Sequence, residues 1–304
     1  MILLLGHTGY VGSEFQRQLV AQETRHRSVS RSELDYTDRD ALIGLIRESQ
    51  ATFVINAAGY TGKPNVDACE LHKSECLAGN AVLPGTIREA CQMAGNVPWG
   101  HVSSGCIYTG RRGDGQGFTE TDEPNFSFRT NNCSWYSGCK ALGEETLADA
   151  ENVFVWRLRI PFNEHDSARN YLSKLVRYER LLQAENSISH LAEFVSACLE
   201  CWRRRVRFGI YNVTNSGSVT TKQVTELIQT HLLPSKTYDF FESEAEFMKV
   251  AAKTPRSNCV MDNSKLLSTG IPMRNVEEAI IQSLQQWQVA SSEQRERTSQ
   301  DASN

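Results

Sequence analysis

The first twelve residues of the chain place the strongest constraint on its fold. An apolar segment, MILLL, runs directly into three glycines spaced three apart: Gly6, Gly9 and Gly12. In a strand-turn-helix unit that holds a dinucleotide, Gly6 permits the sharp turn, Gly9 clears the path of the pyrophosphate, and Gly12 lets helix and strand approach. Phe15 and Leu19 follow at helical spacing, so helix amides face the ligand's negative charge. The alternative is an ordinary glycine-rich loop.

Composition limits the classes of partner. A net charge of −4 over 304 residues provides no global basic field, which argues against nucleic acid and favours a small molecule. The apolar start is too short for a signal peptide and no later run could span a bilayer, so we expect a cytoplasmic chain without a membrane partner. Nine cysteines, an odd number without paired C-x-x-C motifs, suit reduced thiols better than disulfides or a metal site.

Strand-like and helix-like segments alternate through the first half of the chain. This alternation predicts an α/β fold, a doubly wound parallel sheet of the Rossmann type. We expect a break at Pro84 inside one long helical segment. The predicted strands cover residues 26–30, 52–59, 99–104 and 152–161, and the predicted helices cover residues 41–46, 66–93 and 135–150.

The pattern changes after Pro161, where a smaller C-terminal substrate lobe interleaved with the sheet is expected. We assign residues 1–160 to the nucleotide-binding domain, with 191–233 returning to it. Residues 161–190 and 234–285 are assigned to the substrate lobe. Residues 290–304 have almost no apolar content and are expected to be a disordered tail.

Tyr136 and Lys140 lie four residues apart in YSGCK, which places both side chains on one face of a helix. A nearby ammonium lowers the pKa of a phenol from about 10, so the pair suits acid-base work on a carbonyl. Such a pair also arises by chance in structural helices. Ser104 favours catalysis, because it ends a strand of the same sheet and can hydrogen-bond a carbonyl oxygen.

The glycine turn, Ser104, Tyr136 and Lys140, in this order, resemble the extended short-chain dehydrogenase/reductase family over nearly the whole chain. Two further segments match: NAAG at 56–59, which in the family passes under the cofactor, and Asn80. More specific stretches are similar to the nucleotide-rhamnose synthase/epimerase-reductase enzymes, relatives of the 4-keto-6-deoxy-sugar reductases. These stretches are TGKPNVDACE at 61–70, SSGCIY at 103–108, RNYLSKLVRY at 169–178 and PRSNCVMDNSKL at 255–266.

The resemblance implies that one site epimerises carbons 3 and 5 of a nucleotide-linked 4-keto sugar and then reduces carbon 4. Cys106, expected on the same strand as Ser104, stands where related dehydratases carry Glu and would be the base. Lys174 matches the opposing acid-base position and would add positive charge near the thiol. The alternatives are a buried apolar Cys106 and a solvated Lys174.

The nicotinamide cofactor is expected to be NADP(H), with NAD(H) as the alternative. Glu33 stands near the place of an acidic residue that binds the ribose of NAD, whereas Arg31 follows the predicted second strand and can meet a 2′-phosphate. Arg31 as a solvated loop cation is the other interpretation. The predicted cofactor-binding residues are Gly6, Thr8, Gly9, Tyr10, Val11, Gly12, Arg31, Ala57, Ala58, Gly59, Tyr60, Tyr136 and Lys140.

The predicted substrate is a nucleotide sugar, contacted by Ser104, Asn163 and Arg256. The Arg256 guanidinium can bind two oxygens of a pyrophosphate; a surface ion pair is the competing account. Two other functions stay open: a reductase that needs a separate epimerase, and a regulatory subunit that binds NADP or a sugar nucleotide without catalysis. UDP and dTDP sugars are not distinguished, and a homodimer through two helices beside the sheet is compatible with the family.

Overall fold

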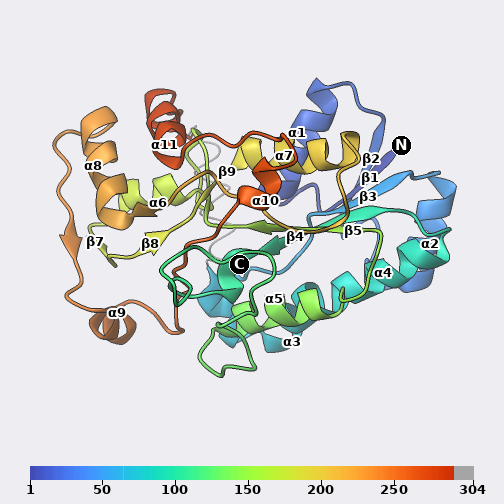
Figure 1. Cartoon of the computed structure of the whole chain (residues 1–304), viewed down its shortest axis with the longest axis horizontal. Coiled ribbons are helices and arrows are strands. Elements are labelled where there is room, and N and C mark those ends of the chain that lie inside the picture. Colours follow the sequence, from blue (N-terminus) through green and yellow to red (C-terminus); the bar gives the residue numbers. More distant parts are fainter. Residues whose placement is uncertain (64, 291–304) are drawn as a thin grey trace.

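The computed structural model describes residues 1–63 and 65–290 of the chain. Its centre is a six-stranded parallel sheet in the order β10-β5-β4-β3-β1-β2. Strands β1 to β5 of this sheet are labelled in Figure 1. The strands of this sheet are β1 (Ile2–Leu5), β2 (His26–Val29), β3 (Phe53–Asn56), β4 (Trp99–Ser104), β5 (Val153–Leu158) and β10 (Gly209–Asn212). The predicted doubly wound parallel sheet is therefore confirmed.

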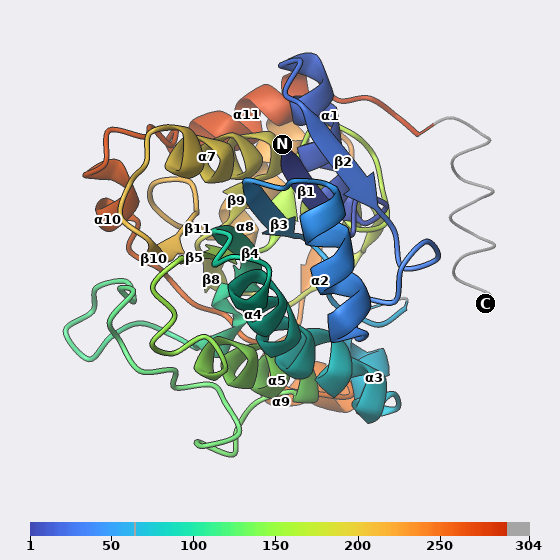
Figure 2. The same cartoon turned by 90° about the vertical axis from the view of Figure 1, so that its right-hand side faces the viewer.

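Helices cover both faces of this sheet (Figure 2). On one face lie α1 (Tyr10–Ala21) and α7 (Leu191–Arg203), which pack against each other and share an apolar core with the sheet. On the other face lie α2 (Arg39–Glu48), α4 (Leu83–Met93) and α5 (Trp135–Glu145). The strand order reverses between β1 and β3, and ligands of open α/β sheets bind at the carboxyl ends of the strands beside such a reversal.

The second lobe has its own apolar cluster, which includes Phe162, Leu172, Ile188, Ile228 and Ile280. Its helices α6, α8 and α11 gather at the end of the molecule away from β2 (Figure 1). The helices outside the main sheet layers are α3 (Lys73–Leu77), α6 (Tyr171–Arg177), α8 (Thr221–His231), α9 (Glu244–Val250), α10 (Ser264–Leu267) and α11 (Val276–Gln285). The short strands are β6 (Pro161–Phe162), β7 (Arg180–Leu181), β8 (Glu185–Asn186), β9 (Ser189–His190), β11 (Val219–Thr220) and β12 (Asp239–Phe240).

The predicted division of the chain differs from the observed packing at one helix. We expected residues 191–233 to return to the large domain, and β10 and α7 do so. Helix α8, however, packs against α11 and buries Val224 and Ile228 in the smaller cluster, because its apolar face matches that lobe. Apart from residue 290, the predicted disordered tail lies outside the described residues.

The predicted long helix at residues 66–93 is divided into shorter pieces. A 3-10 turn at Val66–Glu70, helix α3, a π-helical stretch at Ala78–Val82 and helix α4 follow one another. Pro84 lies in the first turn of α4, directly after the π-helical stretch, so the interruption expected at this proline takes the form of widened turns within a continuous helical segment. The π-helical stretch carries Asn80 towards the end of β3.

Candidate active site

The glycine turn between β1 and α1 is built by close backbone approach. Gly6 has a φ of +80°, and a Cβ atom there would stand 2.6 Å from the amide nitrogen of Ala58. A Cβ on Gly12 would stand 2.0 Å from the carbonyl oxygen of Gly6. The Tyr36 hydroxyl accepts a hydrogen bond from the Gly6 amide at 3.1 Å and donates to the carbonyl of Val29. Steric contact therefore requires glycine at both positions.

The other predicted cofactor residues lie around this turn, on the ends of β1 and β3. Thr8 is exposed in the turn and Gly9 caps α1. Tyr10 begins α1, and its buried phenol faces Ser167 and Glu164 of the second lobe. Val11 packs against the core beneath α1, as does Ala57, which follows β3 next to the buried Ala58.

Asn80 holds the loop that follows β3. Its Nδ2 atom donates to the carbonyl of Tyr60 at 2.6 Å, and its Oδ1 atom accepts from the amide of Tyr60 at 3.2 Å. A Cβ on Gly59 would stand 3.6 Å from Nζ of Lys140. The predicted cofactor loop and the predicted catalytic lysine are therefore neighbours.

Arg31 and Glu33 have different partners after β2. The Glu33 carboxylate accepts from the amide of Ser30 at 2.7 Å and from its hydroxyl at 2.5 Å, so it closes its own turn. Arg31 is exposed, and its Nη2 atom lies 3.4 Å from the carbonyl of Gly59. The cation thus reaches across the carboxyl ends of β2 and β3, while the exposed Glu33 carboxylate is engaged by Ser30.

Tyr136, Ser104 and Lys140 converge as their spacing predicted. Tyr136 lies in the first turn of α5, and its phenol contacts the hydroxyl of Ser104 at the end of β4. Lys140 is buried one turn later, with Nζ 3.5 Å from the carbonyl of Val102. Helix α5 therefore brings both side chains to the carboxyl end of the sheet, where Ser104 lies.

The pKa of the phenol differs from our prediction. Burial raises the pKa of Tyr136 well above 10.0, and the Ser104 hydroxyl only partly offsets this. Burial also lowers the pKa of Lys140 from 10.5. The expected depression of the phenol pKa does not appear, because loss of hydration and the neighbouring thiols outweigh the hydrogen bond with Ser104. Tyr136 is consequently held protonated at neutral pH.

Cys106 lies beyond β4, not on it, which corrects the predicted location. The strand ends at Ser104, whose hydroxyl accepts from the amide of Cys106 at 3.2 Å and starts a 3-10 turn at Gly105–Ile107. The Cys106 thiol nevertheless contacts the hydroxyls of Ser104 and Ser137. Burial raises its pKa, and the cations that oppose this most strongly are Arg159 and Lys140, rather than Lys174 as we expected.

Lys174 lies on α6 of the second lobe, in a cationic group. Burial lowers its pKa from 10.5, and the charges of Arg169 and Arg256 lower it further. Arg169 donates to the carbonyl of Gly62 at 2.8 Å. Lys174 is thus a partly desolvated lysine, which is more able to exchange a proton near neutrality than a solvated one.

Arg256 forms a two-pronged ion pair. Its Nη1 and Nη2 atoms bind the carboxylate of Asp67 at 2.6 and 2.7 Å, in a half-buried position. The ion pair that we weighed against pyrophosphate binding therefore exists in the structure. Asn163, the third predicted substrate residue, is buried, and its Oδ1 atom accepts from Asn170 at 3.0 Å and from the His165 amide at 3.2 Å.

Several residues at the site were not predicted. Arg169 adds a cation beside Lys174, and Asp67 supplies the carboxylate that pairs with Arg256. Both lie in stretches that resemble the family, but neither residue was predicted to have a role. Three buried cysteines, Cys69, Cys76 and Cys139, form a cluster against which Tyr136 packs. Their clustering depends on the packing of α3 against α5, which spacing in the sequence does not reveal.

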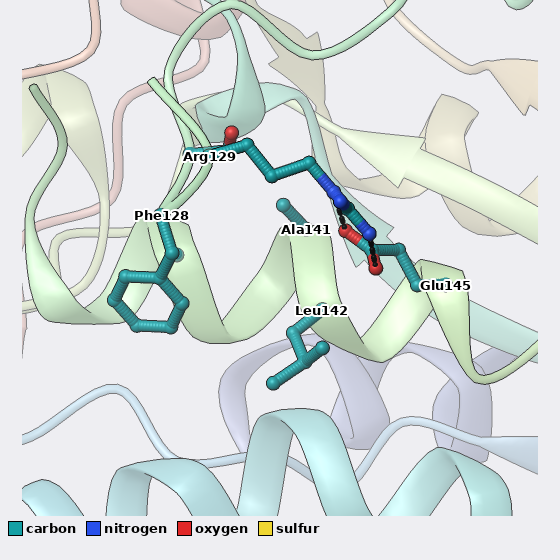
Figure 3. A pocket seen from close by; sticks show the side chains of 7 residues that line it. Phe128, Arg129, Ala141, Leu142 and Glu145 are labelled. Carbon is teal, nitrogen blue, oxygen red and sulfur yellow. Dashed lines mark hydrogen bonds and ion pairs between the residues drawn. The ribbon is translucent and has the colours of Figure 1, made fainter. Parts of the chain in front are cut away.

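A small pocket is lined by one face of α5 (Figure 3). Helical spacing places this face opposite Tyr136 and Lys140. The floor of the pocket consists of Gly138, Ala141, Leu142 and Glu145, at the i, i+3, i+4, i+7 spacing of one helix face. Arg129 closes one side by donating from Nε and Nη2 to the Glu145 carboxylate at 3.0 and 2.6 Å. The lining residues are Ser127, Phe128, Arg129, Gly138, Ala141, Leu142 and Glu145. This pocket contains none of the predicted site residues.

The chain is 34% identical over 284 residues to the bifunctional dTDP-4-dehydrorhamnose 3,5-epimerase/dTDP-4-dehydrorhamnose reductase of Arabidopsis thaliana, covering 92% of this chain and 90% of that protein. It is 32% identical to a trifunctional UDP-glucose 4,6-dehydratase/UDP-4-keto-6-deoxy-D-glucose 3,5-epimerase/UDP-4-keto-L-rhamnose-reductase of the same plant, covering 92% of this chain but 41% of that protein.

Solved structures share the fold. The UDP-rhamnose synthase of Acanthamoeba polyphaga mimivirus superposes with a TM-score of 0.85 at 24% identity, covering 94% and 98% of the two chains. The dTDP-4-dehydrorhamnose reductase of Bacillus anthracis, solved in complex with NADP, superposes with a TM-score of 0.76 at 17% identity, covering 92% and 96%. A family model described as RmlD substrate binding domain matches residues 1–289, and the chain therefore belongs to that family.

Proposed function

We propose that the protein is an NADPH-dependent enzyme that epimerises carbons 3 and 5 of a nucleotide-linked 4-keto-6-deoxyhexose and then reduces carbon 4, giving a nucleotide-rhamnose. The convergence of Ser104 and Tyr136 with Lys140 beside the glycine turn carries this proposal. The relatives named for both half-reactions support it, since one of them matches along 90% of its length. UDP and dTDP sugars both occur among these relatives and both remain candidate substrates.

The glycine turn and Arg31 would hold the cofactor. Gly6, Thr8, Gly9, Tyr10, Val11 and Gly12 form the turn and the start of α1, whose amides suit a pyrophosphate. Arg31 would meet the 2′-phosphate of NADPH, because Glu33 is engaged with Ser30 and Arg31 extends towards Gly59. When bound, NADPH supplies the hydride for carbon 4. The segment from Ala57 to Tyr60 would lie along the cofactor.

Tyr136 would donate the proton in the reduction. Its raised pKa keeps the phenol protonated at neutral pH, and protonated phenol is the form that a reductase requires. Ser104 contacts this phenol and would hydrogen-bond the same carbonyl oxygen. Lys140, beside Gly59, would hold the cofactor ribose and stabilise the phenolate that forms.

Cys106 and Lys174 would act before the reduction. A 4-keto group acidifies the hydrogens on both neighbouring carbons, so a base on one face and an acid on the other can invert each centre. Cys106 would serve as the base and Lys174 as the acid, from the large domain and the second lobe respectively. Arg256 and Asn163 are proposed to contact the nucleotide sugar, with the Arg256–Asp67 pair opening to a pyrophosphate.

The decisive experiment supplies purified protein with the UDP- or dTDP-linked 4-keto-6-deoxyglucose and NADPH, without added epimerase. We expect nucleotide-rhamnose, identified by NMR, and loss of absorbance at the NADPH band. A product reduced at carbon 4 but not epimerised at carbons 3 and 5 would exclude the epimerase activity from the proposed function. Tight NADPH binding without turnover on either substrate would favour a regulatory subunit.

A cysteine variant then tests the isomerising half separately. Cys106→Ser is expected to lower solvent deuterium uptake at carbons 3 and 5 by about 100-fold or more, because a hydroxyl is a far weaker base than a thiolate. Its reduction of a sugar that is already epimerised should persist. Undiminished deuterium uptake would exclude the thiol as the base.

Two further predictions concern partners and compartment. No helix within residues 1–63 and 65–290 is long and apolar enough to cross a membrane. We propose a cytoplasmic enzyme, and the free state of all nine cysteines is compatible with a reducing compartment. A homodimer through α4 and α5, which lie beside each other on one face of the sheet, also remains a proposal.

A further inference from the structure

Arg159 is a buried cation that the proposed reaction leaves without a role. It lies just after β5, and 5% of its surface is exposed. Its Nη2 atom donates to Oδ1 of Asn186 at 2.5 Å and to the carbonyl oxygen of Ser257. Its Nε atom is buried without a hydrogen-bond partner. Over residues 1–63 and 65–290, no carboxylate forms an ion pair with this guanidinium.

Burial of a guanidinium without an anionic partner destabilises the folded protein unless a negative charge forms nearby. Neutral oxygens satisfy part of a guanidinium but do not compensate its charge in a medium of low polarity. Arginine remains protonated in proteins, so it cannot avoid this cost by losing a proton. The structure around Arg159 therefore invites a search for a group that can become an anion.

The turn at Gly105–Ile107 supplies a group that can become an anion, the thiol of Cys106. A Cβ atom on Gly105 would stand 3.4 Å from Cδ of Arg159, so the arginine stem lies against the residue that precedes Cys106. Met261 fills the rest of this space, with its sulfur 2.2 Å from the same Cβ position. Arg159 is therefore buried against the turn that presents Cys106.

A second thiol near Arg159 has a different role. Arg159 and Ser257 contact the Cys259 thiol and favour its ionised form. Its Sγ atom also donates to the carbonyl oxygen of Gly105 at 3.3 Å, however, and this bond requires the proton. Cys106 instead contacts the hydroxyls of Ser104 and Ser137, both of which favour its ionised form. Of the two thiols, Cys259 thus makes a hydrogen bond that ionisation would break, whereas the contacts of Cys106 with the two hydroxyls suit a thiolate.

We propose that Arg159 is a positioning residue that supports the thiolate of Cys106 through its fixed charge and without contacting the substrate. This inference rests on the proposed function only for the catalytic use of that thiolate. The charged and titratable groups that face Cys106 are Arg159 after β5, Lys140 and Tyr136 on α5, and Cys133 in the preceding loop. Lys140 lies beside the cofactor loop. Arg159 pairs with no carboxylate of the described residues, and the other thiol that it contacts, Cys259, uses its proton in the bond to Gly105.

The test is a direct titration of the thiol, which needs no turnover. The ultraviolet absorbance of the thiolate is followed against pH for each protein and for the same protein carrying Cys106→Ser, and the difference reports Cys106 alone. Arg159→Met, which keeps the length of the stem but removes the charge, should raise the midpoint of this difference by one pH unit or more. The thiolate fraction at neutral pH then falls about ten-fold. Arg159→Lys should restore part of it.

Asn186→Asp gives a second variant of nearly the same shape, which loses the bond that Nδ2 donates to Oδ1 of Asn258 at 3.2 Å. A carboxylate at this position still accepts from Arg159 and from the Cys259 amide, but it pairs with the guanidinium and cancels its field at Cys106. The same upward shift is expected, and this variant decides alone if Arg159→Met does not fold. Unchanged midpoints in the folded variants would overturn the inference.

The two proposals can fail separately. A thiol titration that depends on Arg159, in an enzyme that takes up no deuterium at carbons 3 and 5, would leave the inference standing and remove the isomerising function. Deuterium uptake that depends on Cys106, together with a thiol midpoint that does not change when Arg159 is replaced, would overturn the inference and leave the isomerising function standing. Reduction of an already epimerised substrate measures whether each variant retains the folded reductase site.

Discussion

At the scale of single residues, burial changes the pKa values of the proposed acid and base in opposite directions. It raises the pKa of the Cys106 thiol above 9.0 and lowers the pKa of the Lys174 ammonium below 10.5. Isomerisation needs the thiolate, which is lost below the raised pKa, and the ammonium, which is lost above the lowered one. The two required forms therefore coexist best within a limited pH range.

This predicts different pH profiles for the two half-reactions. Deuterium uptake at carbons 3 and 5 should follow a bell, rising as Cys106 ionises and falling as Lys174 loses its proton. Reduction of an already epimerised substrate should stay level to higher pH, because the pKa of Tyr136 lies well above 10.0. Initial rates of both reactions across a pH series provide the measurement. Profiles that coincide would contradict the separate roles.

The sequence predicts residues whose roles depend on local spacing. Tyr136 and Lys140 share a face of one helix, and Ser104 ends a strand, so their convergence follows from period and topology. The sequence did not predict a role for Arg159 or Asp67, because their partners lie far away in the chain. Arg159 donates to the carbonyl of Ser257, and Asp67 accepts from Arg256. The pKa of Tyr136 was also mispredicted, since the extent of burial is a property of the assembled fold.

At the scale of elements, the junction of β1 and α1 depends on the absence of side chains. Gly12→Ala would place a Cβ atom 2.0 Å from the carbonyl oxygen of Gly6 and force the turn open. We expect a loss of about 1–3 kcal/mol in the free energy of unfolding from overpacking, together with much weaker NADPH binding. Urea unfolding and cofactor fluorescence measure the two effects.

Gly44→Ala is a matched control for that substitution. Gly44 lies inside α2, where a Cβ atom would meet nothing within 4 Å. Alanine there should stabilise the protein by about 0.5–1 kcal/mol, because it restricts the unfolded chain and favours helix. Equal destabilisation by the two alanines would show that close approach at Gly12 is not the cause.

The limits of sequence prediction are also visible at this scale. The strand segments were predictable because buried parallel strands are short apolar runs bounded by turn residues. Helix α8 was assigned to the wrong lobe, since periodicity shows that a helix has an apolar face but not which core receives it. The turn at Gly105–Ile107 depends on the hydrogen bond between Ser104 and the Cys106 amide, which a strand pattern does not encode.

At the scale of the whole molecule, a polar seam joins the two lobes. Glu164, just after β6, lies 3.5 Å from Nε2 of His190, whose other ring nitrogen lies 3.6 Å from Glu193 on α7. Glu193 also binds Arg274, ahead of α11, and accepts from Asn215 at 2.9 Å. Because substrate is proposed to lie between Cys106 of one lobe and Lys174 of the other, this seam would fix the separation of the two groups.

Glu164→Gln tests how much the seam contributes to stability. The pKa of Glu164 is lowered to about 2 in the folded protein, chiefly by its hydrogen bond with His190, from an ordinary value of 4.5. A depressed carboxylate pKa stabilises the fold above pH 4.5, and this contribution disappears as pH falls towards 2. The variant should therefore unfold at lower denaturant concentration at pH 7, and its difference from the unmodified protein should shrink with acidification.

Glu226→Gln, at an exposed position on α8 with Lys222 4.0 Å away, should change stability little at any pH. A Glu164→Gln deficit that stayed constant down to pH 3 would mean that the side chain contributes through packing rather than charge.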